Sequence, residues 1–505
     1  MSPTSTVPPS STDILVIGGG PAGAYTAAAL AREGFQVTLL EKEHFPRYHI
    51  GETMLPSMRP FLRFIGAEEK VESFGFTVKV GAALKLNQAK REGYTDFLAR
   101  GATSWSFTRA DFDDIILKHA AENGVSVHEG VRVTEIKFSA ENAEKPTSVE
   151  WKSDQAVGET TFSWLVDASG RNGIMSTRYL KNRKFNENPA LKNMASWGYW
   201  AGAGMYAPGT DRENAPWFEA LTDETGWAWF IPLHNGTVSV GVVVSDASNR
   251  IKKSQHTDAK ALYLSQLQLT PGLVELLGDA KLVSDIKTGS DYSYHASDSK
   301  YAGPNYRIAG DAGAHLAFTN GMTAAATISA SIRGQCSEEE AMEFHSKKVA
   351  ISYTRFLMVV LSIYKQIHQQ ESPVISDLDE DNFDRAFEFI KPVIQGMADT
   401  EKLTESVLQS TLDFCANTLA PMDPEMHERV AKRYPSLMSI WGPVLEPQAL
   451  ADIIGDDKEA QEVMKEINAR KAVNKVYNWA EHFGDNVNGF TVVLKQGSLG
   501  LQRAD

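Results

Sequence analysis

The sequence predicts an α/β protein with three parts: a unit of the Rossmann type, a second sheet of antiparallel strands and a helical C-terminal region. Residues 13–41 run from an apolar strand through a glycine-rich turn and a helix to a second strand that ends in an acid. Short alternating runs such as 236–244, GTVSVGVVV, are typical of antiparallel strands. From residue 336 the apolar spacing becomes helical, as in 338–361 and 457–483.

Composition excludes several classes of function. The 505 residues, 42% of them hydrophobic, suffice for a large core. A net charge of −14 argues against nucleic acid as a partner, because phosphate binding needs a basic face. Cys336 and Cys415 give no disulfide framework, and no Cys/His spacing indicates a metal site. The N-terminus lacks a signal peptide and the run 356–364 is too short to cross a bilayer, so we expect a cytoplasmic protein without a membrane span.

The turn between the first strand and its helix carries the motif G-x-G-x-x-G at Gly18, Gly20 and Gly23. Gly18 allows the tight turn, Gly20 lets the backbone approach a pyrophosphate, and Gly23 lets the helix pack closely against the strand. The phosphates then lie on helix N–H donors, with Gly19 and Ala22 beside them. The pattern indicates an adenosine diphosphate moiety but does not separate FAD from NAD.

Further candidate cofactor residues follow the second strand. Glu41 closes this strand, where a carboxylate accepts hydrogen bonds from ribose hydroxyls. The segment 47–57, RYHIGETMLPS, then places Arg47 and Glu52 where a flavin ring system would lie in such a fold. Arg109, at the start of an amphipathic helix, can neutralise pyrophosphate or a ring carbonyl, and a solvated helix start is the alternative interpretation.

Two later segments resemble the flavoprotein monooxygenase superfamily. Residues 306–315, YRIAGDAGAH, resemble its second flavin fingerprint, in which an aspartate, here Asp311, takes a ribityl hydroxyl, and 165–171, LVDASGR, resemble the strand and turn that close the flavin domain. The resemblance implies FAD in a GR2, p-hydroxybenzoate-hydroxylase-like domain, with Met322 among its contacts. Because the sequence carries only one nucleotide fingerprint, it shows no obvious separate Rossmann unit for a nicotinamide cofactor, and reduced FAD is expected from a separate flavin reductase. The alternative is a single-component aromatic hydroxylase, since such enzymes bind NAD(P)H without a second fingerprint.

Residues 226–232, GWAWFIP, match the W-x-W-x-I-P signature of flavin-dependent halogenases. The segments 46–66, 226–241 and 376–387 are similar to the fungal branch that chlorinates phenolic polyketides, the radicicol type serving resorcylic lactones. Without that context, two tryptophans two residues apart would indicate core packing on one face of a strand. The resemblance implies chlorination of a small phenolic polyketide or meroterpenoid in fungal secondary metabolism, with chloride or bromide as the halide.

The same resemblance implies the catalytic residues. Lys85, in the segment 81–94, stands where the family keeps its catalytic lysine, whose buried ammonium polarises hypohalous acid or carries the halogen as a haloamine. Trp227 and Trp229 then stand between flavin and substrate, which argues against direct hydroxylation. An ordinary strand lysine with its head in water is the alternative for Lys85.

One segment departs from the family pattern. In relatives, GDAG is followed by a loop containing Asp-Pro-Phe and Ser-x-Gly, whose backbone holds chloride, and then by an apolar helix, whereas this chain reads GDAGAHLAFTNG. Either 314–334 correspond to that helix and most of the loop is absent, or Thr319, Asn320 and Gly321 replace the Ser-x-Gly turn, which makes Asn320 and Gly321 halide-binding candidates. A FAD-dependent aromatic hydroxylase and a halogenase relative with an impaired halide site therefore stay open as alternatives.

The domain boundaries follow the changes of periodicity. Residues 1–12 are expected to form a disordered polar tail. Residues 13–335 form the FAD-binding domain, interleaved with the strands of a substrate sheet at 81–108 and 185–285, and residues 336–505 form a helical region expected to cap the substrate pocket.

Overall fold

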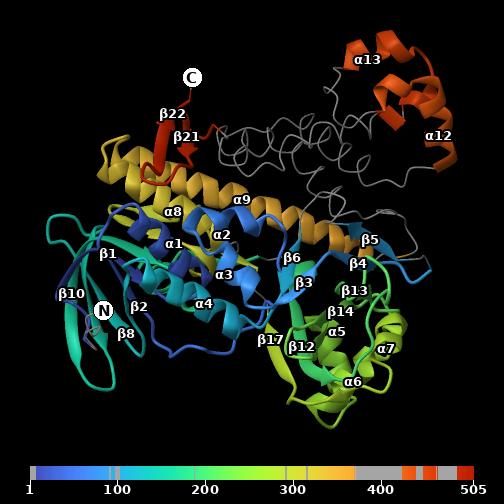
Figure 1. Ribbon diagram of the computed structural model, residues 1–505, viewed down its shortest axis with the longest axis horizontal. Coiled ribbons are helices and arrows are strands. Elements are labelled where there is room, and N and C mark those ends of the chain that lie inside the picture. Colours follow the sequence, from blue (N-terminus) through green and yellow to red (C-terminus); the bar gives the residue numbers. More distant parts are fainter. Residues whose placement is uncertain are drawn as a thin grey trace.

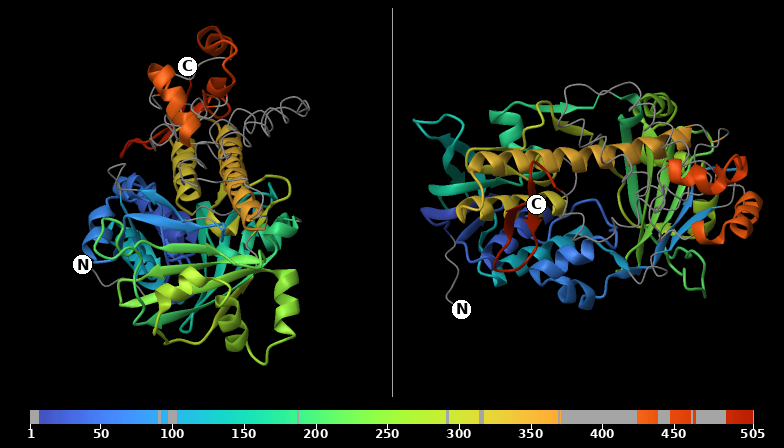
Figure 2. Two further views of the ribbon diagram at one scale, coloured as in Figure 1. Left: turned by 90° about the vertical axis from the view of Figure 1, so that its right-hand side faces the viewer. Right: turned by 90° about the horizontal axis from the view of Figure 1, so that it is seen from above.

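The structure is a computed structural model of the 505-residue chain. The residues that it describes are 7–89, 92–96, 103–186, 188–290, 293–313, 317–368, 370, 424–438, 447–461, 463–464 and 486–504. Figure 1 shows a sheet near each end of the molecule, with the long helix α9 (Glu338–His368) running lengthwise beside both. The view from above in Figure 2 shows the same arrangement.

The first sheet is of the Rossmann type that the sequence predicts. Strand β1 pairs in parallel with β10 on one side and with β2 on the other, in the order β19-β20-β10-β1-β2-β7. Leu15 and Val16 are fully buried, as expected of a parallel strand that is covered on both faces. The strands of this sheet are β1 (Ser11–Ile17), β2 (Val37–Leu40), β7 (Ser126–His128), β8 (Arg132–Phe138), β9 (Pro146–Lys152), β10 (Val157–Asp167), β19 (Ala302–Gly303) and β20 (Tyr306–Ile308).

Helices cover this sheet, and α1 lies at the centre of the layer, in contact with α4, α8 and α2. Half of the residues of α1 are alanines, so the neighbouring helices approach its backbone closely. The helices of this layer are α1 (Pro21–Arg32), α2 (Met58–Ile65), α3 (Glu68–Ser73), α4 (Arg109–Glu122) and α8 (Ala317–Ile332).

The predicted tail 1–12 is shorter in the structure. Strand β1 already begins at Ser11, and Thr12 is buried, so the domain boundary predicted at residue 13 was wrong by two residues. The carbonyl of Pro9 accepts a hydrogen bond from a threonine hydroxyl of β10, which ties the chain to the sheet before the apolar run begins. Residues 1–6 lie outside the described residues.

The second sheet has the order β16-β12-β15-β14-β13-β4-β5, with β17 also paired to β12. Most of its neighbours are antiparallel as predicted, but β4 and β13 are parallel, so the sheet is mixed. Strand β6 (Ser104–Ser106), placed in this sheet by the sequence, pairs instead with β3 (Thr77–Lys79) in a separate ladder. The strands are β4 (Gly81–Lys85), β5 (Gly93–Asp96), β12 (Asn193–Ala201), β13 (Trp217–Ala220), β14 (Gly226–Pro232), β15 (Thr237–Ser245), β16 (Lys281–Leu282) and β17 (Lys287–Ser290).

The two faces of the second sheet bury different partners. Alternate residues such as Ala228, Phe230 and Val240 pack against α6 (Ala259–Leu267) and α7 (Pro271–Leu277), beside α5 (Asp246–Lys253). The opposite face carries Trp197 of β12 and both tryptophans of β14, and it packs against Ile50 of the first domain. We call these the helix face and the flavin-domain face.

The C-terminal region is helical only in part. Its described helices are α9, α12 (Pro424–Arg433) and α13 (Pro447–Ile454). The last described residues form a hairpin of β21 (Phe490–Val493) and β22 (Gly500–Arg503), which corrects the all-helical prediction for 336–505. This hairpin packs on α8, and its apolar side chains belong to the core around α1. The chain therefore returns to its first domain at its end.

One buried histidine makes stability depend on pH. His345, in α9, is fully buried and its Nε2 lies 2.9 Å from the carbonyl oxygen of Ile308. Burial lowers the pKa of His345 from 6.5 to about 3. As the pH is lowered from 6.5 to 3, this imidazole is protonated in the unfolded chain but stays neutral in the folded chain. The free energy of unfolding should therefore fall over this range, with a slope of up to ~1.4 kcal/mol per pH unit.

The variant His345→Gln should flatten this slope, because an amide donates to the same carbonyl and does not titrate. Urea unfolding at several pH values between 7.5 and 4.5 measures it. If wild type and variant lose stability in parallel, His345 is not the responsible group.

Candidate active site

The glycine-rich turn has the geometry that its motif predicts. Gly18 has φ +104°, and a Cβ on it would lie 2.3 Å from the carbonyl oxygen of Ala168. A Cβ on Gly23 would lie 1.9 Å from the carbonyl oxygen of Gly18, so only glycine permits this contact between helix and strand. Gly20, the N-cap residue of α1, has an open side, where the nearest atom to an added Cβ is Arg47 Nη2 at 3.4 Å. A helix N-terminus beside a cation is a suitable cradle for a pyrophosphate.

Glu41 follows β2 and is buried beside this turn. Its carboxylate accepts hydrogen bonds from the amides of Gly19, at 2.6 Å, and Glu43, at 2.8 Å. These bonds fix the carboxylate at the end of the strand, where the motif places the acid that meets a ribose.

The two predicted cations, Arg47 and Arg109, share one buried carboxylate, which the sequence analysis did not single out. The Asp113 side chain is fully buried, and its oxygens lie 2.9 Å from Arg47 and 2.7 Å from Arg109. Arg109 also donates to the carbonyl oxygen of Ile50 at 2.9 Å. Arg109 and Asp113 are four residues apart on α4, and that spacing was the available signal for their pairing.

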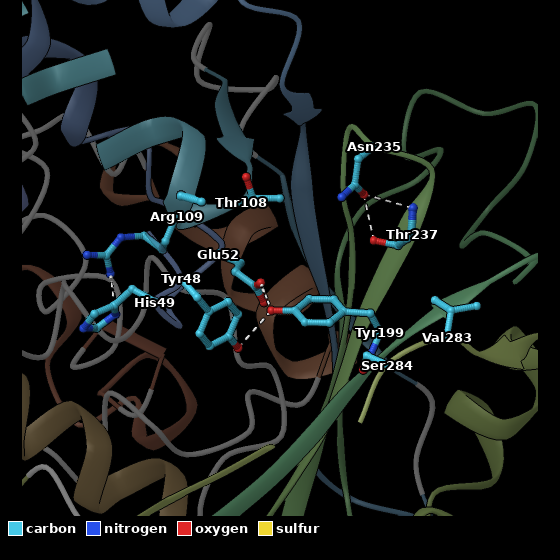
Figure 3. A pocket seen from close by; sticks show the side chains of 11 residues that line it. Tyr48, His49, Glu52, Thr108, Arg109, Tyr199, Asn235, Thr237, Val283 and Ser284 are labelled. Atoms are coloured by element: carbon cyan, nitrogen blue, oxygen red, sulfur yellow. Dashed lines mark hydrogen bonds between the residues drawn. The ribbon is translucent and has the colours of Figure 1, made fainter. Parts of the chain in front are cut away.

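Glu52 lies at the boundary between the first domain and the second sheet (Figure 3). Its carboxylate accepts a hydrogen bond from the Tyr199 hydroxyl at 2.6 Å, and the Tyr199 hydroxyl also bonds that of Tyr48 at 3.0 Å. Burial raises the pKa of Glu52 above its ordinary value and lowers the pKa of His49. These four residues and Arg109 line a cavity of about 380 Å³.

The second fingerprint turn meets the first. Gly310 has φ +63° at the start of a short 3₁₀ turn, η5 (Gly310–Ala312), and a Cβ there would lie 2.7 Å from that of Ala22. Asp311, partly exposed, therefore stands beside the N-terminus of α1. Met322 is fully buried in the core of the same domain. The two glycine turns and Glu41 thus lie at the carboxyl ends of β1, β2 and β20, whereas the predicted contact Met322 lies inside the core.

The structure decides between the two alternatives for the shortened segment. Helix α8 begins at Ala317, so Thr319, Asn320 and Gly321 are helical and form no glycine turn. A Cβ on Gly321 would lie 2.8 Å from the Thr26 hydroxyl of α1, which explains the glycine by helix packing. The alternative in which residues 319–321 replace the Ser-x-Gly turn was therefore wrong, because the small residues serve the contact between helices. Residues 314–316, which precede α8, lie outside the described residues.

The signature tryptophans form a wall on the flavin-domain face. Trp227 and Trp229 have ring centroids 5.9 Å apart, and Trp197 of β12 lies 6.3 Å from Trp229. Trp229 is 7% exposed, and its indole donates to the Ser239 hydroxyl at 3.1 Å. A Cβ at Gly241 would fall 2.1 Å from the Trp229 ring, so glycine in β15 makes room for the indole.

Lys85 is on the other face of this sheet. The parallel register pairs Lys85 with Glu219, whose carboxylate accepts from amides of α7, while Leu84 pairs with Phe218 on the flavin-domain face. Since residues alternate along a strand, Lys85 projects to the helix face, and it is half-buried. The buried ammonium expected at this position is therefore not found there.

A second lysine, Lys79, was missed by the sequence analysis. It ends β3 and is 3% exposed, and its ammonium lies 3.3 Å from the carbonyl oxygen of Met54. The segment from Glu52 to Met54 is hydrogen-bonded to β6, the partner of β3, so this ammonium lies next to the segment that contributes Glu52 to the cavity. Lysine is among the residue types that are least often fully buried, but burial is not visible in a sequence.

Within the described ranges, no three His, Cys, Asp or Glu side chains gather in a way that could hold a metal ion. Nor is any described helix both long and apolar enough to cross a membrane.

The fold is that of solved FAD-dependent halogenase structures. The structure is similar to that of the myxobacterial chondrochloren halogenase CndH, with a TM-score of 0.63 and 24% identity over 82% of this chain and 98% of that one. The family model named tryptophan halogenase matches residues 13–100 and 83–273.

Curated relatives are closer still. Flavin-dependent halogenase armH1 of Armillaria mellea is 55% identical over 98% of this chain and 99% of its own length. Sulochrin halogenase gedL of Aspergillus terreus is 42% identical over 98% of this chain and 94% of its own length. This chain belongs to the flavin-dependent halogenase family and is an enzyme that works with reduced FAD. The alignment with armH1 covers 520 positions, more than the 505 residues present, so armH1 has residues without a counterpart here.

Proposed function

We propose that this enzyme halogenates an electron-rich phenolic ring of a polyketide or meroterpenoid in fungal secondary metabolism, in the manner of the radicicol-type branch. The observation that carries the proposal is the indole wall of Trp197, Trp229 and Trp227 on the flavin-domain face. At one end of this wall the Trp227 indole donates to the Tyr364 hydroxyl of helix α9 at 3.2 Å. Such a wall keeps a substrate from direct contact with a flavin while a small oxidant passes. The name of the relative from Aspergillus terreus, sulochrin halogenase, supports an organic small-molecule substrate.

The residues present fit FAD in a GR2, p-hydroxybenzoate-hydroxylase-like mode. The open side of Gly20, with the amides of α1 and the guanidinium of Arg47, takes the pyrophosphate. Glu41 and Asp311 accept hydroxyls of the ribose and the ribityl chain, and Arg109 and Glu52 adjoin the ring system. Reduced FAD, when bound, supplies hypohalous acid from O2 and chloride or bromide. We propose that a separate flavin reductase delivers it in the cytoplasm.

The ammonium that directs the halogen is Lys79 in this proposal. It is buried, and its ammonium lies 3.3 Å from the carbonyl oxygen of Met54, two residues after the cavity-lining Glu52, from where an ammonium would polarise a hypohalous oxygen. Lys85 remains the position that the resemblance favours, but the sheet separates it from the indole wall. The two lysines are thus distinguishable by substitution.

A second candidate function depends on whether this chain can bind the halide. In sequence, three residues separate Gly313 from the start of α8, fewer than the loop that the resemblance expects at this point. The proposed halide contacts Asn320 and Gly321 belong to a helix. A halogenase relative that reduces O2 to peroxide without halogenation is the alternative that this observation favours. An aromatic hydroxylase is disfavoured by the indole wall.

One assay separates these functions. The purified protein is incubated with FAD, a flavin reductase, NADH, bromide or chloride, and a resorcylic phenol, and the products are analysed by mass spectrometry. We expect a halide-dependent mass gain that disappears without reductase. Oxygen insertion with NADH alone would instead identify a hydroxylase, and peroxide as the single product would identify an impaired halide site.

A further inference from the structure

The carbonyl groups of the turn η5 are held from behind by two side chains. Arg183, at the start of β11 (Arg183–Phe185), donates from Nη2 to the carbonyl oxygen of Ala312 at 2.8 Å and to that of Asp311 at 3.1 Å. Tyr294, in the partner strand β18 (Tyr294–Ala296), donates its hydroxyl to the carbonyl oxygen of Asp311 at 2.9 Å. When the oxygen of a peptide group is fixed by hydrogen bonds, the plane of that peptide is fixed too, and with it the direction of the adjacent side chain and N–H group.

The same guanidinium joins this turn to the end of β10. Its Nη1 donates to the carbonyl oxygen of Arg171 at 2.5 Å, and its carbon lies 4.2 Å from the centroid of the Tyr294 ring. Gly173, with φ +49°, makes the space, because a Cβ there would lie 1.9 Å from Arg183 Nη2. Arg183 therefore connects the turn after β10 with the turn after β20, the two turns that border the nucleotide edge of the first sheet.

The guanidinium of Arg183 holds backbone carbonyl groups in place and does not serve as the partner of a carboxylate among the described residues. Burial lowers the pKa of Arg183, with the charges of Asp167 and Asp311 acting in the opposite sense. Among the described residues, the hydrogen-bond acceptors of Arg183 are carbonyl oxygens and no carboxylate lies within ion-pair distance. A planar fork can reach carbonyls of two turns at once, which the single ammonium of a lysine cannot do.

We propose that Arg183 is a positioning residue for the flavin: by holding the carbonyls of Asp311 and Ala312, it sets the direction in which the second fingerprint turn meets the ribityl chain and ring. The inference rests on the proposed binding of FAD along this edge.

Binding of FAD to the full-length protein tests the proposal, measured by quenching of flavin fluorescence. Arg183→Ala should raise the Kd of FAD at least tenfold and shift the absorption spectrum and midpoint potential of the bound flavin. Added guanidinium ion should restore binding, whereas sodium at equal ionic strength should not. Arg183→Lys should recover only part of the affinity. The losses of FAD affinity in Arg183→Ala and Tyr294→Phe should be non-additive in the double variant, because both side chains hold the Asp311 carbonyl.

The control is Arg178→Ala, five residues earlier on the same segment, where an exposed guanidinium reaches one carbonyl at 3.3 Å. This variant should bind FAD as the wild type does. A wild-type Kd for Arg183→Ala would overturn the proposal, and so would weakened binding with a lowered melting temperature that guanidinium does not restore. Since this readout needs no product, a protein that binds FAD without halogenating refutes the proposed function and leaves the role of Arg183 intact.

Discussion

Lys79→Met is expected to abolish halogenated product while the protein still binds FAD and oxidises reduced flavin. The substitution keeps the stem of the side chain and removes the N–H groups, so the loss falls on the step in which an oxidant is held and directed. Removing one preorganised donor from a dry site typically lowers a rate by roughly 10²- to 10³-fold. Product formation and flavin oxidation are measured in the same reaction, with mass spectrometry for the first and absorbance for the second.

Lys85→Met is the matched control, since it makes the same change six residues away on the helix face of the second sheet. We expect it to keep at least half of the wild-type product. If Lys85→Met loses product and Lys79→Met keeps it, the family position is right and the assignment from burial and strand face fails. The melting temperatures of both variants must stay within a few degrees of wild type for the comparison to hold.

Gly23→Ala is expected to have the second large effect. The added Cβ would meet the carbonyl oxygen of Gly18 at 1.9 Å, a contact with backbone that no side-chain rotation relieves. Helix α1 must move away from β1, at a cost of roughly 3 kcal/mol by the range for overpacked sites. Both thermal stability and FAD affinity should fall, and calorimetry with a flavin titration measures them.

Gly20→Ala separates the two effects. A Cβ at this position has no atom nearer than Arg47 Nη2 at 3.4 Å, so the apo fold should keep its melting temperature. The methyl group occupies the open side at which a pyrophosphate would approach, and FAD affinity should still fall. Equal loss of stability in both variants would mean that this side of the turn is not open.

The local features of the fold could be predicted from the sequence, because their signals lie close together in the chain. The glycine turn between β1 and α1 and the strand of the two tryptophans are read from single short segments, and the structure has both. The shared carboxylate of Asp113 could not be predicted in full, since its second partner, Arg47, is contributed by a distant segment.

Lys85 shows the physical limit of such reasoning most clearly. Its strand was predicted correctly, but the face to which its side chain projects depends on the parallel pairing of β4 with β13, which are more than 120 residues apart. A shift of one residue in that register would reverse the face. Lys79 was overlooked because only tertiary packing buries it.

The C-terminal hairpin has a consequence for how this enzyme is made. The amide of Leu499 donates to the buried Glu33 carboxylate at 3.0 Å. The guanidinium of Arg333 lies 2.8 Å from the same carboxylate and donates to the Leu499 carbonyl oxygen at 2.6 Å. Domains usually fold in order as the ribosome releases them. Here the core of the first domain stays incomplete until residues 486–504 have been synthesised, and a chain cut before them leaves that domain unclosed.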